Sequence, residues 1–180
     1  MDANKRNGAE EEVTIDLLEI FYLFRAKIVW ILIAAIIGAL YAALTLALPV
    51  LSYGAWQCRI SEALTLLPLV LPEAVPGLFI GCIAANLLSP VGIWDVVFGS
   101  LATLLAAIAT WRLRKKNLLA AACPVIANGL IVGIMLSVVY ALPMALTILQ
   151  VALGEAVAVA IGYLLLPLLK KSALQKYLSH

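Results

Sequence analysis

The sequence predicts an all-α integral membrane protein with six transmembrane helices. Of its 180 residues, 65% are hydrophobic and only 12% are charged, and the mean hydropathy is +1.10. These values lie well beyond those of a soluble domain with a single core. A transmembrane helix needs about 20 apolar residues, or fewer inside a bundle, and the chain contains several runs of this kind.

Six apolar runs meet this requirement, and prolines and glycines mark the boundaries between them. The runs cover about residues 28–50, 58–71, 74–89, 95–111, 119–141 and 144–169. Two prolines and a glycine at 71–77 separate the short second and third runs, which we therefore expect to form a tight helical hairpin. Similar breaks at 89–92 and 141–143 predict two short loops.

The basic residues outside these runs predict the orientation of the chain. Lysines and arginines gather before the first run, in the loop at 112–116 and after the last run. Short basic loops stay in the cytoplasm, and six spans place all three segments on that side. We expect a cytosolic N-terminal extension of residues 1–27, a transmembrane domain of residues 28–169 and a cytosolic tail of residues 170–180.

The N-terminal extension does not resemble a cleaved leader. Residues 1–27 are too acidic and lack the small-residue cleavage site of a secretory or transit peptide. Leu17, Phe21, Phe24 and Ile28 recur at helical spacing, which suggests an amphipathic helix at the membrane interface. A simple extension of the first span is the alternative.

Small residues repeat every fourth position along the first run and predict a face for close helix packing. The two rows are Ala35, Ala39, Ala43 and Ala47, and beside them Ala34, Gly38 and Ala42. Helices in lipid associate where small residues let two backbones approach, and the partner can be internal or another protein. Gly129 and Gly133 in the fifth run suggest contacts within the bundle.

Seven polar residues in or beside the apolar runs are candidate substrate-binding residues. They are Arg59, Glu62, Asn86, Asp95, Asn128, Gln150 and Glu155. An ionisable side chain at mid-bilayer costs about 2.5 to 3.5 kcal/mol on insertion scales, so each one is a hypothesis for a functional site. Glu155 is the deepest carboxylate, roughly 16 Å from the outer end of its run at a rise of 1.5 Å per residue.

These residues also have structural alternatives. Arg59 and Glu62 can pair with each other, because side chains three residues apart meet on a helix. Asp95 can cap the helix that it begins, and Glu73 can cap the helix after the turn. The amides and a protonated Glu155 can hydrogen-bond between helices.

The positions of most of these residues converge on the outer half of the membrane, where Trp56, Trp94 and Tyr140 also lie. This arrangement suggests an outward-facing pocket. Carboxylates accept hydrogen bonds from ring N–H and amino groups, arginine or asparagine donates to a carbonyl, and aromatic rings stack. Such a pocket suits a flat, polar, nitrogen-rich solute, which composition alone does not identify.

Three cysteines and one histidine give no sign of metal or redox chemistry. Cys58, Cys82 and Cys123 have neither metal nor redox spacing, and the histidine is the terminal His180. We therefore expect buried free thiols, no metal site and no cofactor.

Several segments resemble the QueT family of integral membrane proteins. They are LYAALTL at 40–46, RISEALTLLP at 59–68, PGLFIGC at 76–82, ANLL at 85–88, WDVVFGSLATL at 94–104 and GE at 154–155. The resemblance extends over about residues 39–169. It implies the substrate-binding S component of an energy-coupling factor (ECF) transporter, an ABC-type importer of the bacterial cytoplasmic membrane.

The same resemblance implies a cargo and a set of binding residues. The cargo is a queuosine precursor, a 7-deazaguanine base whose donor-rich edge and possible aminomethyl cation match carboxylates. By motif, Arg59, Glu62, Asn86, Asp95 and Glu155 carry over as substrate-binding residues.

The resemblance also implies protein partners. The first helix of such S components docks on a transmembrane coupling subunit, and Ala35, Ala39 and Ala43 fit that role. Two separate ATPase subunits hydrolyse ATP. This chain has no Gly-x-x-x-x-Gly-Lys-Ser/Thr loop, so we expect that it is not the ATPase. As a solute-binding subunit it is expected to be neither an enzyme nor a partner of nucleic acid.

Two other functions remain as alternatives. An autonomous ion-coupled carrier would use Glu62 or Glu155 as a proton relay. Residues 11–33 differ from the short start of the QueT family and look more like the opening of a polysaccharide chain-length determinant, which suggests a membrane assembly or chain-length regulator protein.

Overall fold

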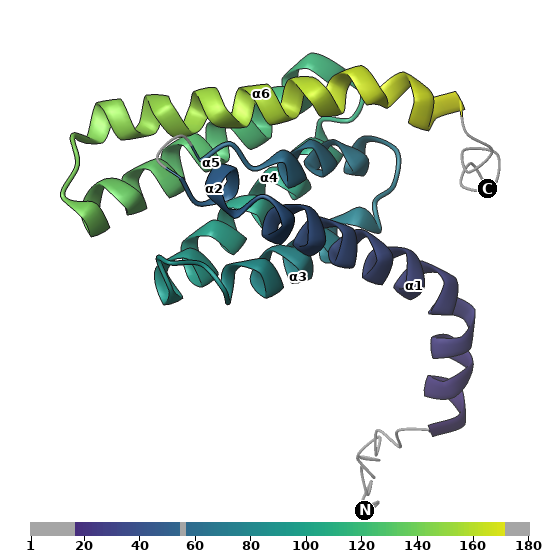
Figure 1. Cartoon of the computed structure of the whole chain (residues 1–180). Helices are drawn as coiled ribbons and strands as arrows, with labels where there is room; N and C mark the ends of the chain where they lie inside the picture. The colour runs from purple at the N-terminus through teal and green to yellow at the C-terminus, as the bar shows by residue number, and fades with distance from the viewer. Residues whose placement is uncertain (1–16, 55–56, 172–180) are drawn as a thin grey trace, which may run out of the picture.

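The computed structural model describes residues 17–54 and 57–171, and over these residues the chain is a bundle of helices (Figure 1). The helices are α1 (Leu17–Ala47), α2 (Pro49–Ser52), η1 (Ile60–Leu69), α3 (Ala74–Asn86), η2 (Asp95–Gly99), α4 (Ser100–Arg112), α5 (Asn117–Tyr140) and α6 (Met144–Lys171). No strand occurs in the described residues. The all-α fold class is therefore confirmed. Most of the expected extension and tail, and also Trp56, lie outside the described residues.

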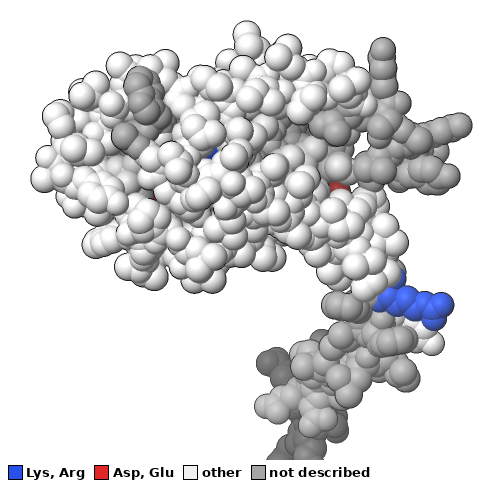
Figure 2. Space-filling view, viewed as in Figure 1, with Lys and Arg blue, Asp and Glu red and all other residues white. Residues whose placement is uncertain are grey.

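Four helical segments in the described part are long and apolar enough to cross a membrane. They are Lys27–Ala47, Asp95–Arg112, Asn117–Tyr140 and Met144–Leu168. The face of the bundle in Figure 2 is almost without charge: the large patch of Lys or Arg atoms lies on the projecting part of α1, and elsewhere only small charged spots are visible. The second and third expected spans form the shorter helices η1 and α3, so a count of six spans stays a prediction.

The second expected span differs from a transmembrane α-helix. Residues 60–69 form a 3₁₀ helix, η1, that contains Pro68. It contacts α1, α3, α4, α5 and α6, and most of its side chains are buried. A helix enclosed by other helices in this way has little surface for lipid and does not need the length of a lipid-exposed span. The 3₁₀ rise of about 2.0 Å per residue also lets ten residues reach farther than in an α-helix.

The two rows of small residues on α1 have different surroundings. Ala34, Gly38 and Ala42 face α3, where a Cβ added at Gly81 would lie 2.4 Å from the carbonyl oxygen of Gly38. The other row, Ala35, Ala39 and Ala43, is exposed. One row therefore brings α1 and α3 into backbone contact, and the described part of the chain leaves the other row uncovered.

We expect Gly81→Leu to destabilise the bundle, because the new side chain would meet the backbone of Gly38 and push α1 away from α3. Overpacking of this kind costs about 1–3 kcal/mol. Thermal unfolding of the purified protein in detergent measures the effect. Ala39→Leu is the matched control, since it makes a similar change at an exposed position of the same helix pair. Equal unfolding temperatures for the two variants would contradict this packing.

Helices α5 and α6 pack through the two glycines that the sequence singled out. A Cβ at Gly129 would lie 3.0 Å from that of Ala152, and one at Gly133 would lie 2.7 Å from the Cα of Ile148. Both glycines therefore face α6, which confirms the expected contacts within the bundle.

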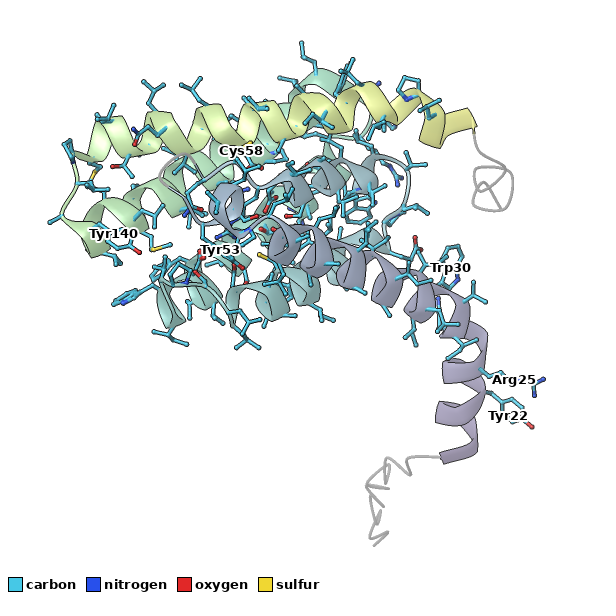
Figure 3. The ribbon with its side chains drawn as sticks, in the orientation of Figure 1. Tyr22, Arg25, Trp30, Tyr53, Cys58 and Tyr140 are labelled. Atoms are coloured by element: carbon cyan, nitrogen blue, oxygen red, sulfur yellow. The ribbon has the colours of Figure 1, made fainter. Side chains whose placement is uncertain are left out.

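The first turns of α1 extend away from the bundle (Figure 1), and Tyr22 and Arg25 lie on this projecting part (Figure 3). The helix is continuous from Leu17 to Ala47, which agrees with an extension of the first span. The side chains of Leu17, Phe21 and Phe24, on which the amphipathic alternative depends, lie outside the described residues, and Ile28 is exposed.

Candidate functional site

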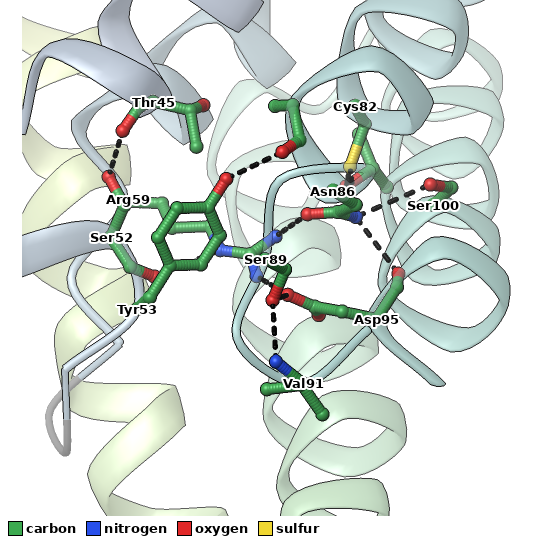
Figure 4. A network of polar contacts seen from close by, with 12 residues as sticks. Thr45, Ser52, Tyr53, Arg59, Cys82, Asn86, Ser89, Val91, Asp95 and Ser100 are labelled. Atoms are coloured by element: carbon green, nitrogen blue, oxygen red, sulfur yellow. Dashed lines mark hydrogen bonds and ion pairs between the residues drawn. The ribbon is translucent and has the colours of Figure 1, made fainter. Parts of the chain in front are cut away.

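Arg59 is buried at the centre of a polar network, with only 4% of its surface exposed (Figure 4). Its Nη2 atom lies 2.6 Å from Oδ2 of Asp95, and Nη1 donates to Oδ1 of Asn86 at 3.1 Å. Its Nε donates to the carbonyl oxygen of Ser52 at 3.2 Å. The guanidinium also lies 5.4 Å from the ring centroid of Tyr53. Arg59 thus joins the segment before η1 to α2, α3 and η2.

Asp95 and Asn86 are fully buried and hold this network together. The Nδ2 atom of Asn86 donates to the carbonyl oxygen of Asp95 at 2.9 Å, and Ser89 Oγ donates to Asp95 Oδ2 at 2.7 Å. Both candidate residues therefore have hydrogen-bond partners within the protein, and both bond to Arg59.

Three structural alternatives from the sequence are wrong. Asp95 makes no capping bond to its own helix. Its carboxylate instead pairs with the buried guanidinium of Arg59. A buried charge without such a partner would be costly. For the same reason Arg59 pairs with Asp95 and not with Glu62. Glu73 stands at the start of α3 but makes no side-chain cap.

Glu62 lies in the middle of the bundle, and its two oxygens have different surroundings. Oε1 accepts hydrogen bonds from the Tyr41 hydroxyl on α1 and, at 3.2 Å, from Thr103 Oγ1 on α4. Oε2 has no hydrogen-bond partner among the described residues. Tyr41 and Thr103 therefore fix the orientation of the carboxyl group and leave one oxygen available.

A small polar cavity lies beside this free oxygen, between η1, α5 and α6. It has a volume of about 10 Å³ and is lined by Gln57, Arg59, Glu62, Asn128, Val132, Val151 and Glu155. Three buried polar atoms of its lining residues make no hydrogen bond of normal geometry among the described residues, namely Glu62 Oε2, Asn128 Nδ2 and Glu155 Oε1. The amide of Asn128 lies close enough to both carboxyl groups to interact with them. A volume of this size holds about one water molecule. We call this space the inner cavity.

A larger cavity of about 260 Å³ adjoins the ends of α5 and α6. It is lined by Tyr53, Gly54, Gln57, Leu136, Tyr140, Leu142, Thr147 and Gln150. We call it the outer cavity. Tyr53, which precedes η1, donates to the carbonyl oxygen of Ala85 at 2.7 Å, and burial raises the pKa of its hydroxyl above the usual value, so the hydroxyl stays a neutral donor.

The structure brings most of the predicted site residues together. Arg59, Glu62, Asn128 and Glu155 line the inner cavity, and Gln150 lines the outer one with Tyr140. Trp94 is half exposed and stacks on Phe98 at a centroid distance of 5.9 Å, away from both cavities.

Sequence reasoning did not select Tyr41, Thr103 or Gln57 as site residues. Tyr41 and Thr103 carry isolated hydroxyl groups in apolar runs, and both are buried. Buried hydroxyl groups need a hydrogen-bond partner, so the sequence could have identified these two residues as members of a polar cluster. Gln57 lies in a loop, where a polar residue gives no signal of this kind.

No group of three or more His, Cys, Asp or Glu side chains in the described residues could hold a metal ion. The three cysteines are free, as expected, but only Cys82 is buried, whereas Cys58 and Cys123 are half-buried.

Comparison with known sequences gives one family. The sequence model of a family described as QueT transporter matches residues 31–171. No curated protein and no solved structure matches the chain.

Proposed function

Because the chain belongs to the QueT transporter family, we propose that it is the substrate-binding S component of an ECF-type importer. Its family and its apolar helices together identify the chain as a multi-pass membrane protein that functions in transport. The proposed cargo is a queuosine precursor, a 7-deazaguanine base. The proposed binding site is the inner cavity together with the outer cavity beside it.

One observation carries the proposal of a binding site here. Glu62 Oε2, Asn128 Nδ2 and Glu155 Oε1 are buried without a hydrogen bond of normal geometry and belong to residues that line one cavity. Buried polar atoms are nearly always hydrogen-bonded, and an unsatisfied one costs about 1–3 kcal/mol. A ligand that bonds to all three atoms would remove this cost, so the cavity favours a polar ligand.

The three atoms suit the chemistry of the proposed cargo. The two carboxylates accept hydrogen bonds, and the amide of Asn128 donates one. A 7-deazaguanine base carries adjacent N–H donors and a carbonyl acceptor on one ring edge. Tyr53 and Tyr140 line the outer cavity, where their rings could stack on a flat heterocycle.

The sizes of the two cavities suggest the order in which a base would enter them. The inner cavity, at about 10 Å³, is too small for a bicyclic base, whereas the outer cavity has about 260 Å³. The base would therefore enter the outer cavity first, and the inner cavity would widen as the base reaches Glu62 and Glu155.

The exposed row on α1 supports the proposed partners. Ala35, Ala39 and Ala43 are uncovered by the described part of the chain, and the first two of them line a groove of about 610 Å³ between α1 and α3. Small residues allow another helix to approach closely in lipid. We assign this face to the transmembrane coupling subunit, which links the chain to two ATPase subunits, with both termini in the cytoplasm.

Ligand-induced thermal stabilisation tests the cargo. We expect 7-deazaguanine bases to raise the unfolding temperature of the purified protein, because a ligand at 100 times its Kd stabilises the folded state by about 2.7 kcal/mol. Stabilisation by an unrelated vitamin, with none by the bases, would contradict the proposal. Uptake into vesicles without ATPase subunits, abolished by an uncoupler, would instead support an ion-coupled carrier that uses Glu62 or Glu155.

A further inference from the structure

Gln57 occupies a position between the two cavities. Among the described residues it alone lines both the outer cavity of about 260 Å³ and the inner cavity of about 10 Å³. Its own surface is only 4% exposed. Gln57 therefore contacts the space on both sides of the boundary between the two cavities.

The backbone at Gln57 has an unusual conformation for this residue type. Its φ is 45°, and Ala141 is the other non-glycine residue with a positive φ in the described part of the chain. Glycine adopts this region freely, whereas a residue with a Cβ is strained there. Residues held in such conformations cluster at ligand clamps and switch regions. Gln57 therefore has a conformation typical of a functional position.

Hydrogen bonds fix this conformation beside the Arg59 network. The N–H of Gln57 donates to the carbonyl oxygen of Gly54 at 3.0 Å, and the N–H of Arg59 donates to the carbonyl oxygen of Gln57 at 3.1 Å. Arg59 is in turn held by Asp95. These bonds hold the backbone of Gln57 beside Arg59, and neither of them involves its side chain.

We infer that the side chain of Gln57 is a selectivity residue that closes the inner cavity in this conformation and admits only ligands able to displace it. The identity of those ligands rests on the proposed function, whereas the closure itself does not. A carboxamide suits this position because it is neutral and both donates and accepts hydrogen bonds. It can face the unpaired atoms of Glu62, Asn128 and Glu155 without adding another charge.

Thiol labelling tests the closure without any ligand. A reporter is made by Val151→Cys, since Val151 lines the inner cavity and is 2% exposed, in a background with Cys58→Ser, Cys82→Ala and Cys123→Ser. The probe is 2-aminoethyl methanethiosulfonate, and its reaction is followed by mass spectrometry.

We expect Gln57→Ala and Gln57→Gly each to speed the labelling of the reporter by about tenfold, because cysteine reactivity follows access. Leu146→Ala, at an exposed position of α6 that lines neither cavity, is the control and should leave the rate unchanged. Acceleration by Gln57→Gly alone would assign the effect to backbone freedom and overturn the inference. So would an unchanged rate in both variants, or an equal acceleration by the control.

Ligand kinetics separate this inference from the proposed function. If 7-deazaguanine bases bind, Gln57→Ala should raise both the association and the dissociation rate constants, with a smaller change in Kd. If none of them binds but labelling still accelerates, the proposed cargo fails and the closure by Gln57 stands.

Discussion

Replacement of Arg59 by methionine should destabilise the protein more than any other single change in the polar network. The substitution leaves Asp95, which is fully buried, without its counter-charge, and it also removes the donors to Asn86 and Ser52. Removal of one partner of a buried ion pair costs about 3–5 kcal/mol. For a protein of this size that corresponds to a fall of roughly 10 °C in unfolding temperature, measured in detergent.

A double variant shows whether the lost charge pair is the cause. Arg59→Met combined with Asp95→Asn removes both charges, so it should be more stable than Arg59→Met alone. The amide oxygen that Asp95→Asn introduces would still accept from Ser89, which bonds to Asp95 at 2.7 Å in the native protein. An unchanged unfolding temperature for Arg59→Met would contradict a structural role for this pair.

The long helices could be predicted from the sequence because their apolar runs are bounded by turn residues. The runs at 119–141 and 144–169 correspond closely to α5 (Asn117–Tyr140) and α6 (Met144–Lys171). The run at 58–71 was less well predicted. Hydropathy reports how apolar a segment is, but it does not distinguish a helix that faces lipid from one that is enclosed, as η1 is.

The residues that line the inner cavity were easier to predict than their pairing. A polar side chain in an apolar run needs a partner, and this reasoning found Arg59, Glu62, Asn128 and Glu155. The expected pairing of Arg59 with Glu62 assumed that both lie on one helical turn. Arg59 instead has an extended backbone before η1, with φ of −83° and ψ of 102°, so its side chain meets Asp95, 36 residues away in sequence.

Helix α1 connects the candidate site to the surface that we assign to the coupling subunit. The hydroxyl of its Tyr41 donates to Glu62 Oε1. The hydroxyl oxygen of its Thr45 lies 2.6 Å from that of Ser61 on η1. Ala39 and Ala43 of the same helix are exposed. A partner that packs on the alanine row would therefore contact the same helix that orients a carboxyl group of the inner cavity.

Glu155→Gln should weaken ligand binding without destabilising the empty protein. Glu155 is 2% exposed, and its Oε1 makes no hydrogen bond of normal geometry among the described residues. A glutamine at this position keeps a carbonyl oxygen that can accept from the nearby Asn128 amide, so the fold loses little. A hydrogen bond to the ligand contributes about 0.5–1.5 kcal/mol, and its loss should raise Kd by roughly 2- to 10-fold. Isothermal titration with 7-deazaguanine bases measures Kd, and thermal unfolding without ligand measures stability.

This combination distinguishes a binding carboxylate from a structural one. If Glu155 instead bonds between helices, the substitution should lower the unfolding temperature and change Kd little. Glu62→Gln is the matched variant, because Glu62 also has one free oxygen but uses the other to accept from Tyr41 and Thr103. We expect it to lose affinity and some stability together. Normal affinity in both variants would place the binding site outside the inner cavity, since no other carboxylate among the described residues lines that cavity.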